Sequence, residues 1–340
     1  MNLTIIIPSR NRPTYLSRAI AYFAGFSEVE ILVCDSSNIP YSKEIPPNVK
    51  YFHSPNVTFI QKIQRVLPHI KTDYVVLCAD DDFLIPKALK ECVEFLGHSP
   101  EYHSAQGNYI AYYQLKNHLF YLPLYTKNLN KSIDYNAPID RISAYWGANI
   151  QLFYSVHRFN SFCTVFNSAN SSITSLNLLE YHIGLSALIM GKNKQLPIFY
   201  GVRELISNSA GTAIGIDVLS SNPDQHEQYE AFIGGISTLF KSKQPELGGH
   251  EEIIREQVVN YLSSADANVF YQKRRRNQRI KRLFPRWIRN FGYKSWLFIN
   301  LKNNRRQNVL FAKANEGFPF GDSINESILK NLEQIILNKE

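Results

Sequence analysis

Three consecutive aspartates, Asp80-Asp81-Asp82, follow an apolar run that ends at Cys78. Carboxylates this close together repel one another, and their pKa values would be raised unless a cation lay among them. A hard divalent ion such as Mn²⁺ or Mg²⁺ removes this cost and commonly bridges carboxylates to phosphates. One acid would suffice to face the N-terminal dipole of the helix expected from Pro86. Three acids favour a metal–phosphate site.

Two further polar clusters follow apolar runs. In the turn Ser9–Pro13, Arg10 and Arg12 lie beside free backbone N–H groups at an expected helix N-terminus. Such a turn suits an anionic ligand, although a surface turn with a Ser or Asn cap would look the same. Asp35 ends the next apolar run, and its carboxylate could accept a hydrogen bond from a nucleobase N–H or a ribose hydroxyl.

The elements that must position these clusters alternate between strand and helix. Apolar runs predict strands at Leu3–Pro8, Val29–Cys34, Val49–His53 and Tyr74–Cys78. Helical spacing predicts helices at Tyr15–Phe26, at Val57–Ile70 and from Pro86. Strands joined by crossover helices form a mostly parallel sheet with ligand sites at the carboxyl ends of the strands, where all three clusters fall. If the fourth strand continued, Asp80 and Asp82 would share one side and Asp81 would face the other.

The rest of the chain lacks the regular alternation of strands and helices. We expect a strand at Ser104–Tyr113, a loop-rich aromatic stretch at Tyr121–Ile150, a helix at Leu176–Met190 and a strand at Pro197–Arg203. From Asn222 onward the pattern is helical, with Gly248-Gly249 as a linker. The aromatic residues at Tyr109–Tyr125, Trp146 and Tyr154 could stack on sugar rings or belong to the core.

The net charge of +8 is unevenly distributed over the 340 residues. Residues 273–306 hold thirteen Lys and Arg and no Asp or Glu, so the remainder of the chain carries −5. Trp287, Trp296 and several Phe lie among these cations, a composition that suits an anionic membrane surface. A helix packed on the domain is the alternative. Nucleic-acid binding is the least favoured, because no RNP or zinc-finger pattern occurs.

Composition bounds the class of protein. The 44% hydrophobic content excludes wholesale disorder, and no apolar run approaches the ~20 residues that a membrane-spanning helix needs. Four scattered cysteines form no CxxC pair and no disulfide framework. The opening residues lack the basic region of a signal peptide, so we expect a cytoplasmic protein, peripheral on the inner face of the membrane.

The three clusters, in this order, resemble the nucleotide-sugar half of glycosyltransferase family 2 and its GT-A-fold relatives. The matching segments are Thr4–Arg12, Ile31–Asp35 and Tyr74–Asp82. The resemblance is good over residues 1–115 and loose to about residue 210. It implies an α/β fold: a GT-A-like, mostly parallel (mixed) sheet flanked by helices, here with a C-terminal helical extension. We expect a domain at 1–215, with a nucleotide-sugar half (1–115) and an acceptor half (116–215), followed by the extension at 216–340.

The resemblance also implies roles for individual residues. Asp35 would contact the nucleobase or ribose, while Pro8, Ser9, Arg10 and Arg12 lie at the nucleotide-contacting turn. Many members carry an aspartate where this chain has Ala79. Asp81 and Asp82 are then the expected ligands of Mn²⁺ or Mg²⁺, and Asp80 would serve the ribose.

The catalytic base of the family lies in an acidic pair at the head of a helix. Glu180 matches the first acid, but Tyr181 stands where the family usually has Asp. Glu180 is the expected base and Glu204 the alternative, with Arg203 beside it as a diphosphate partner. Lys62 could reach the nucleotide or lie on a solvated helix face.

The clusters and the resemblance together predict a metal-dependent transfer of a sugar from a UDP-, GDP- or dTDP-sugar to a glycan or lipid-linked hydroxyl acceptor. The resemblance alone implies that the transfer is inverting. The expected setting is the synthesis of surface glycans such as lipopolysaccharide or capsule. A sugar nucleotidyltransferase would also use strand-end carboxylates, but Ser9–Pro13 lacks the Gly-rich loop expected of one. A catalytically inactive glycan- or nucleotide-binding protein is the other alternative, suggested by Tyr181. The oligomeric state is left open.

Overall fold

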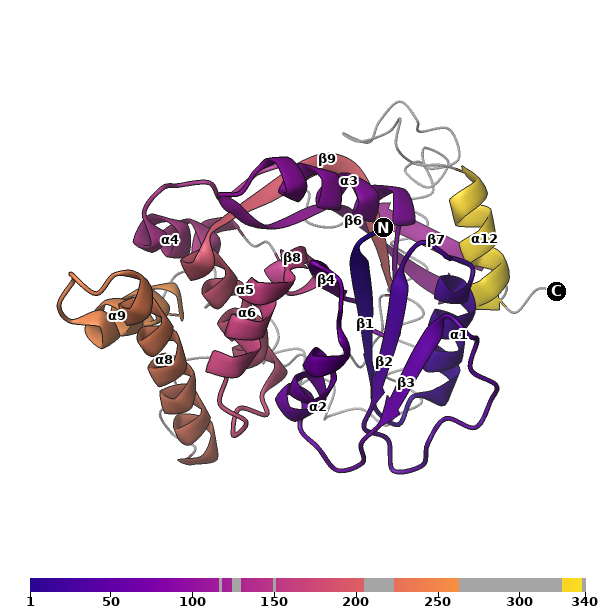
Figure 1. Cartoon of the computed structure of the whole chain (residues 1–340), viewed down its shortest axis with the longest axis horizontal. Coiled ribbons are helices and arrows are strands. Elements are labelled where there is room, and N and C mark those ends of the chain that lie inside the picture. The colour runs from indigo at the N-terminus through magenta and orange to yellow at the C-terminus, as the bar shows by residue number, and fades with distance from the viewer. Residues whose placement is uncertain (116–117, 124–129, 149–150, 205–222, 263–325, 338–340) are drawn as a thin grey trace, which may run out of the picture.

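The computed structural model describes residues 1–115, 118–123, 130–148, 151–204, 223–262 and 326–337 (Figure 1). Its centre is a nine-stranded mixed sheet, in which eight strands run in the order β3-β2-β1-β4-β8-β6-β9-β5 and β7 pairs with β6. The α/β fold class expected from the sequence is therefore confirmed.

The half of the sheet formed by the first four strands is parallel. Its strands are β1 (Leu3–Ser9), β2 (Glu30–Asp35), β3 (Val49–His53) and β4 (Tyr74–Leu77). The helices α1 (Pro13–Ala24) and α2 (Phe59–Val66) connect them, followed by the short 3₁₀ helix η1 (Leu67–His69). Figure 1 shows α1 and α2 on opposite sides of these strands. The order 3-2-1-4 makes the chain reverse its direction across the sheet between β1 and β4, where α/β proteins bind ligands.

The other half of the sheet is mixed. Its strands are β5 (Asp82–Leu84), β6 (Tyr102–Leu115), β7 (His118–Pro123), β8 (Val156–Arg158) and β9 (Lys192–Glu204). β8 lies antiparallel to both β4 and β6 and so joins the halves, while β5 pairs antiparallel with the end of β9. The strand predicted at Pro197–Arg203 is thus the second part of a longer one.

Seven α-helices beyond α2 pack on this frame within the described residues. They are α3 (Pro86–His98), α4 (Pro138–Ala148), α5 (Phe159–Ser168), α6 (Leu176–Met190), α8 (Pro223–Lys243), α9 (His250–Leu262) and α12 (Glu326–Leu337). A 3₁₀ helix, η3 (Leu152–Tyr154), precedes β8. The loop-rich interpretation of Tyr121–Ile150 was wrong where α4 forms, because Pro138 opens that helix and Ile142 and Tyr145 bury one of its faces.

Helix α6 is the centre of a second hydrophobic core. Its buried residues run from Leu178 to Ile189 on almost every side, and such a helix must be covered all round. α8 supplies much of the cover through Phe232, Ile233 and Phe240, which are fully buried in the same cluster. The division at residue 215 stays a prediction, but α8 packs directly on the helix that carries Glu180.

The C-terminal helix α12 returns to the parallel half of the sheet. Leu332 and Ile336 are buried in the core that contains the sheet, and α12 lies beside α1 (Figure 1). The basic segment 273–306 lies outside the described residues. Within the part of the chain that is described, no helix combines the length and apolar character needed to cross a membrane.

The end of α6 is held by a buried arginine. The Nε of Arg141, on α4, donates to the Leu188 carbonyl at 2.6 Å, and Nη1 donates to the carbonyls of Tyr135 and Asn136 at 2.8 and 2.6 Å. The last carbonyls of a helix have no partner within the helix, and a cation there also faces the negative end of its dipole. Arg141 therefore joins the preceding loop to the end of α6.

We expect Arg141→Met to lower the free energy of unfolding by about 2–4 kcal/mol, because several buried carbonyls lose their partner. Arg255→Met is the matched control: Arg255 pairs with Glu230 and Glu251 at the surface, where such pairs are worth about 1 kcal/mol or less. Denaturant unfolding of both variants checks this. Equal losses of stability would contradict the role assigned to Arg141.

Candidate active site

A cavity of about 750 Å³ opens at the carboxyl ends of β1 and β4. It brings together nearly all of the residues predicted from the sequence, namely Pro8, Ser9, Arg10, Arg12, Lys62, Asp80, Asp81, Asp82, Glu180 and Arg203, together with the alternative Glu204. Asp35 does not line it, although its neighbour Ser36 does. The cavity therefore lies at the point of the sheet where the parallel topology predicted a ligand site.

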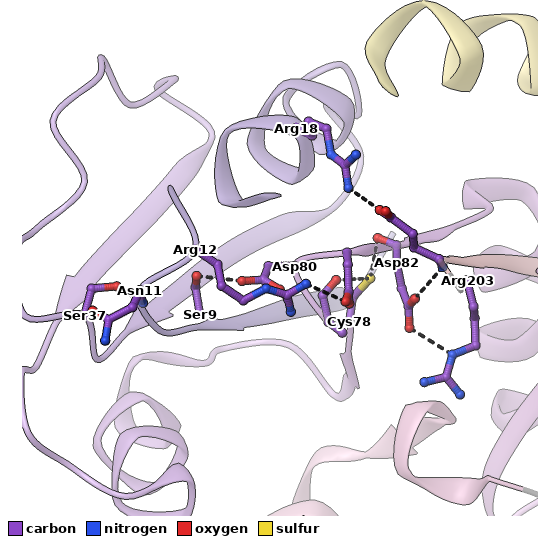
Figure 2. Close-up of polar contacts among 12 residues, drawn as sticks. Ser9, Asn11, Arg12, Arg18, Ser37, Cys78, Asp80, Asp82 and Arg203 are labelled. Atoms are coloured by element: carbon purple, nitrogen blue, oxygen red, sulfur yellow. Dashed lines mark hydrogen bonds and ion pairs between the residues drawn. The ribbon is translucent and has the colours of Figure 1, made fainter. Parts of the chain in front are cut away.

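The aspartates do not alternate as predicted. β4 ends at Leu77, and the chain turns so that the Asp82 N–H donates to the Ala79 carbonyl before β5 begins. Arg12 then contacts both Asp80 and Asp81, with its two terminal nitrogens 2.7 Å from a carboxylate oxygen of each (Figure 2). Asp80 and Asp82 were expected to share a side only if the strand continued, and it does not continue through the aspartates.

Asp82 faces the opposite direction, toward β9. Its Oδ2 accepts from the Arg203 Nε at 3.0 Å and its Oδ1 from the Glu204 backbone N–H at 3.3 Å (Figure 2). The register explains this contact, since Asp82 is paired with Arg203 in the β5–β9 ladder. Burial raises the pKa of Asp82, while the Arg203 guanidinium acts to lower it.

Asp80 is also almost fully buried. One carboxylate oxygen accepts from Arg12 and the other from the Ser9 hydroxyl at 2.7 Å. Burial raises the pKa of Asp80 to about 6 despite the opposing effect of Arg12. Both oxygens of Asp80 and both of Asp82 are thus engaged by the protein itself.

Asp81 differs from its neighbours. It lines the cavity, its side chain is 16% exposed, and Arg12 contacts its Oδ2 alone, so its Oδ1 has no partner among the described residues. Within those residues no group of three or more His, Cys, Asp or Glu side chains could by itself hold a metal ion. One carboxylate oxygen fits a Mg²⁺-type ion that completes its coordination with phosphate oxygens and water.

Lys62 and Arg10 lie at the β1–β2 end of the cavity. Thr58 caps α2 with a capping box, which places Lys62 one turn into the helix, where its Nζ donates to the Ser9 carbonyl at 2.8 Å. Lys62 is buried, which lowers its pKa, so the solvated-face alternative does not hold. Arg10 is exposed and has no ion-pair or hydrogen-bond partner within the described part of the chain.

Asp35 supports the turn that carries these cations. Its Oδ1 accepts from the Ser37 hydroxyl at 2.5 Å, and the Ser37 Oγ in turn accepts the Asn11 backbone N–H at 2.6 Å. Its Oδ2 accepts from the Tyr51 hydroxyl at 2.8 Å. Asn11 has a positive φ of 55°, which Asn tolerates better than most residues. The Asp35 carboxylate therefore connects β2 and β3 to the Ser9–Pro13 turn.

Glu180 approaches the cavity from the opposite side, on the second turn of α6. No hydrogen bond or ion pair is present on its carboxylate among the described residues, and Arg203 is its nearby cation. Burial raises the pKa of Glu180, and Arg203 opposes this. Tyr181 packs instead against Trp146 and Tyr261, with the Trp146 ring centroid 5.2 Å away. The structure thus brings Glu180, and not Tyr181, to the cavity.

Glu204 is held by an ion pair that the sequence did not indicate. The Arg18 guanidinium lies 2.5 Å from the Glu204 Oε2, and the Tyr112 hydroxyl donates to the same oxygen at 2.6 Å. Tyr15, also at the cavity, lies between two cations, with the Arg12 and Arg18 guanidinium carbons 4.1 and 4.6 Å from its ring centroid. The three-residue spacing of Arg12, Tyr15 and Arg18 could have indicated from the sequence that these side chains share one helix face.

Comparisons with known proteins agree with this arrangement. Residues 4–154 match the sequence model of the family described as Glycosyl transferase family 2. A structure of S. aureus TarS 1-349 in complex with UDP-GlcNAc is 14% identical, with a TM-score of 0.51, covering 79% of this chain and 75% of that one. The UDP complex of the same protein is 13% identical, with a TM-score of 0.51 and coverages of 79% and 74%. A search of curated proteins found no match.

The fold and the cavity define a GT-A-type α/β domain with the strand-end cluster of a nucleotide-sugar enzyme. The match over residues 4–154, which is less than half of the chain, together with the fold, supports a glycosyltransferase of family 2. The resemblance seen in the three sequence motifs is thereby confirmed.

Proposed function

We propose that the chain transfers a sugar, with inversion, from a nucleoside diphosphate sugar to a hydroxyl acceptor. The observation that carries this is the polarity of the cavity. Internal ion pairs engage Asp80, Asp82 and Glu204. This leaves Arg10 and Lys62 at one end and, at the other, the Glu180 carboxylate, which is unpaired among the described residues.

The cationic end is suited to the nucleotide. Arg10 has no carboxylate partner in the described residues, and the Lys62 ammonium is held by neutral oxygen atoms. An anion entering a partly buried space is attracted most strongly by charges that are not already paired. The diphosphate would lie within reach of Arg10 and Lys62 and extend toward Arg12, Asp81 and Arg203. The nucleoside would lie against the turn that Asp35 and Ser37 support.

UDP-, GDP- and dTDP-sugars are the proposed donors. The S. aureus TarS structures hold UDP and UDP-GlcNAc, which makes UDP-GlcNAc the first compound to test. A panel of nucleotide sugars, assayed for release of the nucleoside diphosphate, tests the proposal. Binding without turnover of any member would favour the inactive binding protein.

Asp81 is the proposed ligand for Mn²⁺ or Mg²⁺, and Asp82 becomes the weaker candidate because Arg203 and the Glu204 N–H engage its oxygens. When bound, such an ion neutralises the charge that develops on the departing diphosphate. Arg12 contacts Asp81 as well, so its guanidinium lies beside the same position and could contact the diphosphate directly.

Glu180 is the proposed general base. Its carboxylate would accept the proton of the acceptor hydroxyl while that oxygen bonds to the anomeric carbon of the donor. The bond from this carbon to the phosphate oxygen breaks, and the electron pair leaves with the nucleoside diphosphate. Arg203, near both Glu180 and Asp82, would stabilise the leaving group. A single displacement needs one unpaired carboxylate, and it inverts the anomeric centre.

We expect Asp81→Asn to lower metal-dependent donor turnover by about 100-fold or more, because the cation that Asp81 would hold could no longer offset the developing phosphate charge. The assay is release of nucleoside diphosphate during a titration with Mn²⁺. Asp73→Asn is the matched control, since Asp73 is exposed at the other end of β4 and bonds with Asn2. Full Mn²⁺-stimulated turnover in the Asp81 variant would refute the metal role.

Glu180→Gln should reduce turnover by about 100- to 10,000-fold while leaving nucleotide affinity unchanged. The base acts deprotonated, and burial raises its pKa. The activity should therefore be present at high pH and be lost as pH falls through a value above the ordinary ~4.3 of glutamate. The pH profile of kcat/KM checks this. A larger loss in Glu204→Gln than in Glu180→Gln would assign the base to Glu204.

Attachment of residues 273–306 to an anionic membrane surface is also proposed, on the basis of composition alone. The full chain should co-sediment with vesicles that contain anionic lipid and not with neutral ones. Replacing the basic residues at 273–289 with Gln should abolish this co-sedimentation, while donor turnover persists. Unchanged vesicle binding in that variant would contradict the proposal.

A further inference from the structure

The wall of the cavity that leads to Glu180 is a short turn. Thr174 and Leu176 both line the cavity, α6 begins at Leu176, and Glu180 follows about one helical turn later. The position of this turn therefore determines where the Glu180 carboxylate lies relative to an acceptor hydroxyl.

The turn does not secure the helix start by itself. Ser175 is the N-cap of α6, yet its side chain makes no capping hydrogen bond. A residue from another helix contacts this point: the Oε1 of Gln228, on α8, accepts the backbone N–H groups of Thr174 at 2.9 Å and Ser175 at 2.8 Å. The Thr174 hydroxyl lies 3.3 Å from the same oxygen. Three donors thus converge on one amide oxygen.

Helix α8, which carries that oxygen, is packed against α6 through buried apolar residues. Tyr229 follows Gln228 directly and is 8% exposed, and Phe232 and Ile233, one turn further on, are fully buried against α6. Gln228 itself is half-buried at the edge of this contact. Its amide can therefore be altered without removing any of the apolar residues that hold the two helices together.

We infer that Gln228 is a positioning residue for the transfer reaction: it holds the Thr174–Leu176 turn and so aligns Glu180 with the acceptor hydroxyl. The inference rests on the proposed function of Glu180. It gives α8, outside the matched residues 4–154, a part in catalysis. Displacement of a catalytic group by about 1 Å can cost on the order of 100-fold in rate, so a remote contact of this kind is able to control turnover.

The test compares Gln228→Leu with Gln228→Glu. The leucine variant lacks the acceptor, whereas a glutamate oxygen can accept the same three bonds and its charge suits a helix N-terminus. Gln257→Leu is the matched control, because Gln257 joins α9 to Ser143 of α4 and neither residue lines the cavity. Hydrogen exchange at Thr174 and Ser175 reports the contact, and steady-state kinetics use the nucleotide sugar that the wild type turns over fastest.

We expect faster exchange at both amides in Gln228→Leu, a fall in kcat of about 10- to 100-fold and a KM for the donor within about twofold. Gln228→Glu should restore both exchange and kcat, and Gln257→Leu should change neither. An unchanged kcat in the leucine variant, or a loss in kcat that glutamate does not restore, would overturn the inference while leaving the proposed function intact. If the wild type turned over no donor, the proposed function would fail, whereas unaltered exchange would refute the contact itself.

Discussion

Pairing of buried carboxylates is the constraint on which the site depends. Three adjacent aspartates at the end of a buried strand cannot stay ionised without cations, and removing one member of a buried pair costs about 3–5 kcal/mol. Arg12, from the turn after β1, contacts Asp80 and Asp81, while Arg203, from β9, contacts Asp82. The contacts that neutralise the aspartates therefore also fix the segment between β4 and β5 against the turn after β1 on one side and against β9 on the other.

This pairing also decides which groups remain for a substrate. Once Asp80, Asp82 and Glu204 have arginine partners, the cavity keeps an exposed cation at Arg10 and a carboxylate at Glu180, on opposite walls. The cavity therefore has one cationic wall and one acidic wall, and this polarity follows from ion pairs within the protein itself. Under the proposed function, this polarity would favour one orientation of a charged donor.

The sequence predicted the parts of this arrangement that are local. The parallel strands and α6 were correct, with bounds at Leu176–Met190 that the structure reproduces, because apolar periodicity is a property of neighbouring residues. β5 was missed, since a strand of three residues exists through its pairing with β9. The contact of Asp80 and Asp81 with one arginine was also not predicted, because a turn at Ala79 replaces the extended backbone that the sequence suggested. No local pattern connects Arg18 with Glu204 across 186 positions.

The packing of α8 against α6 is an example of a contact that the local sequence does not predict. Its sequence is apolar on nearly every side, which already required a second layer, but the sequence of α6 contains nothing that specifies the helix supplying it. Phe232 and Ile236 of α8 fill that role, and the same helix carries Gln228 to the turn before Glu180. Under the proposed function, the residue types near Glu180 indicate a base, while its alignment to within about an ångström would depend on a helix that begins more than forty positions later.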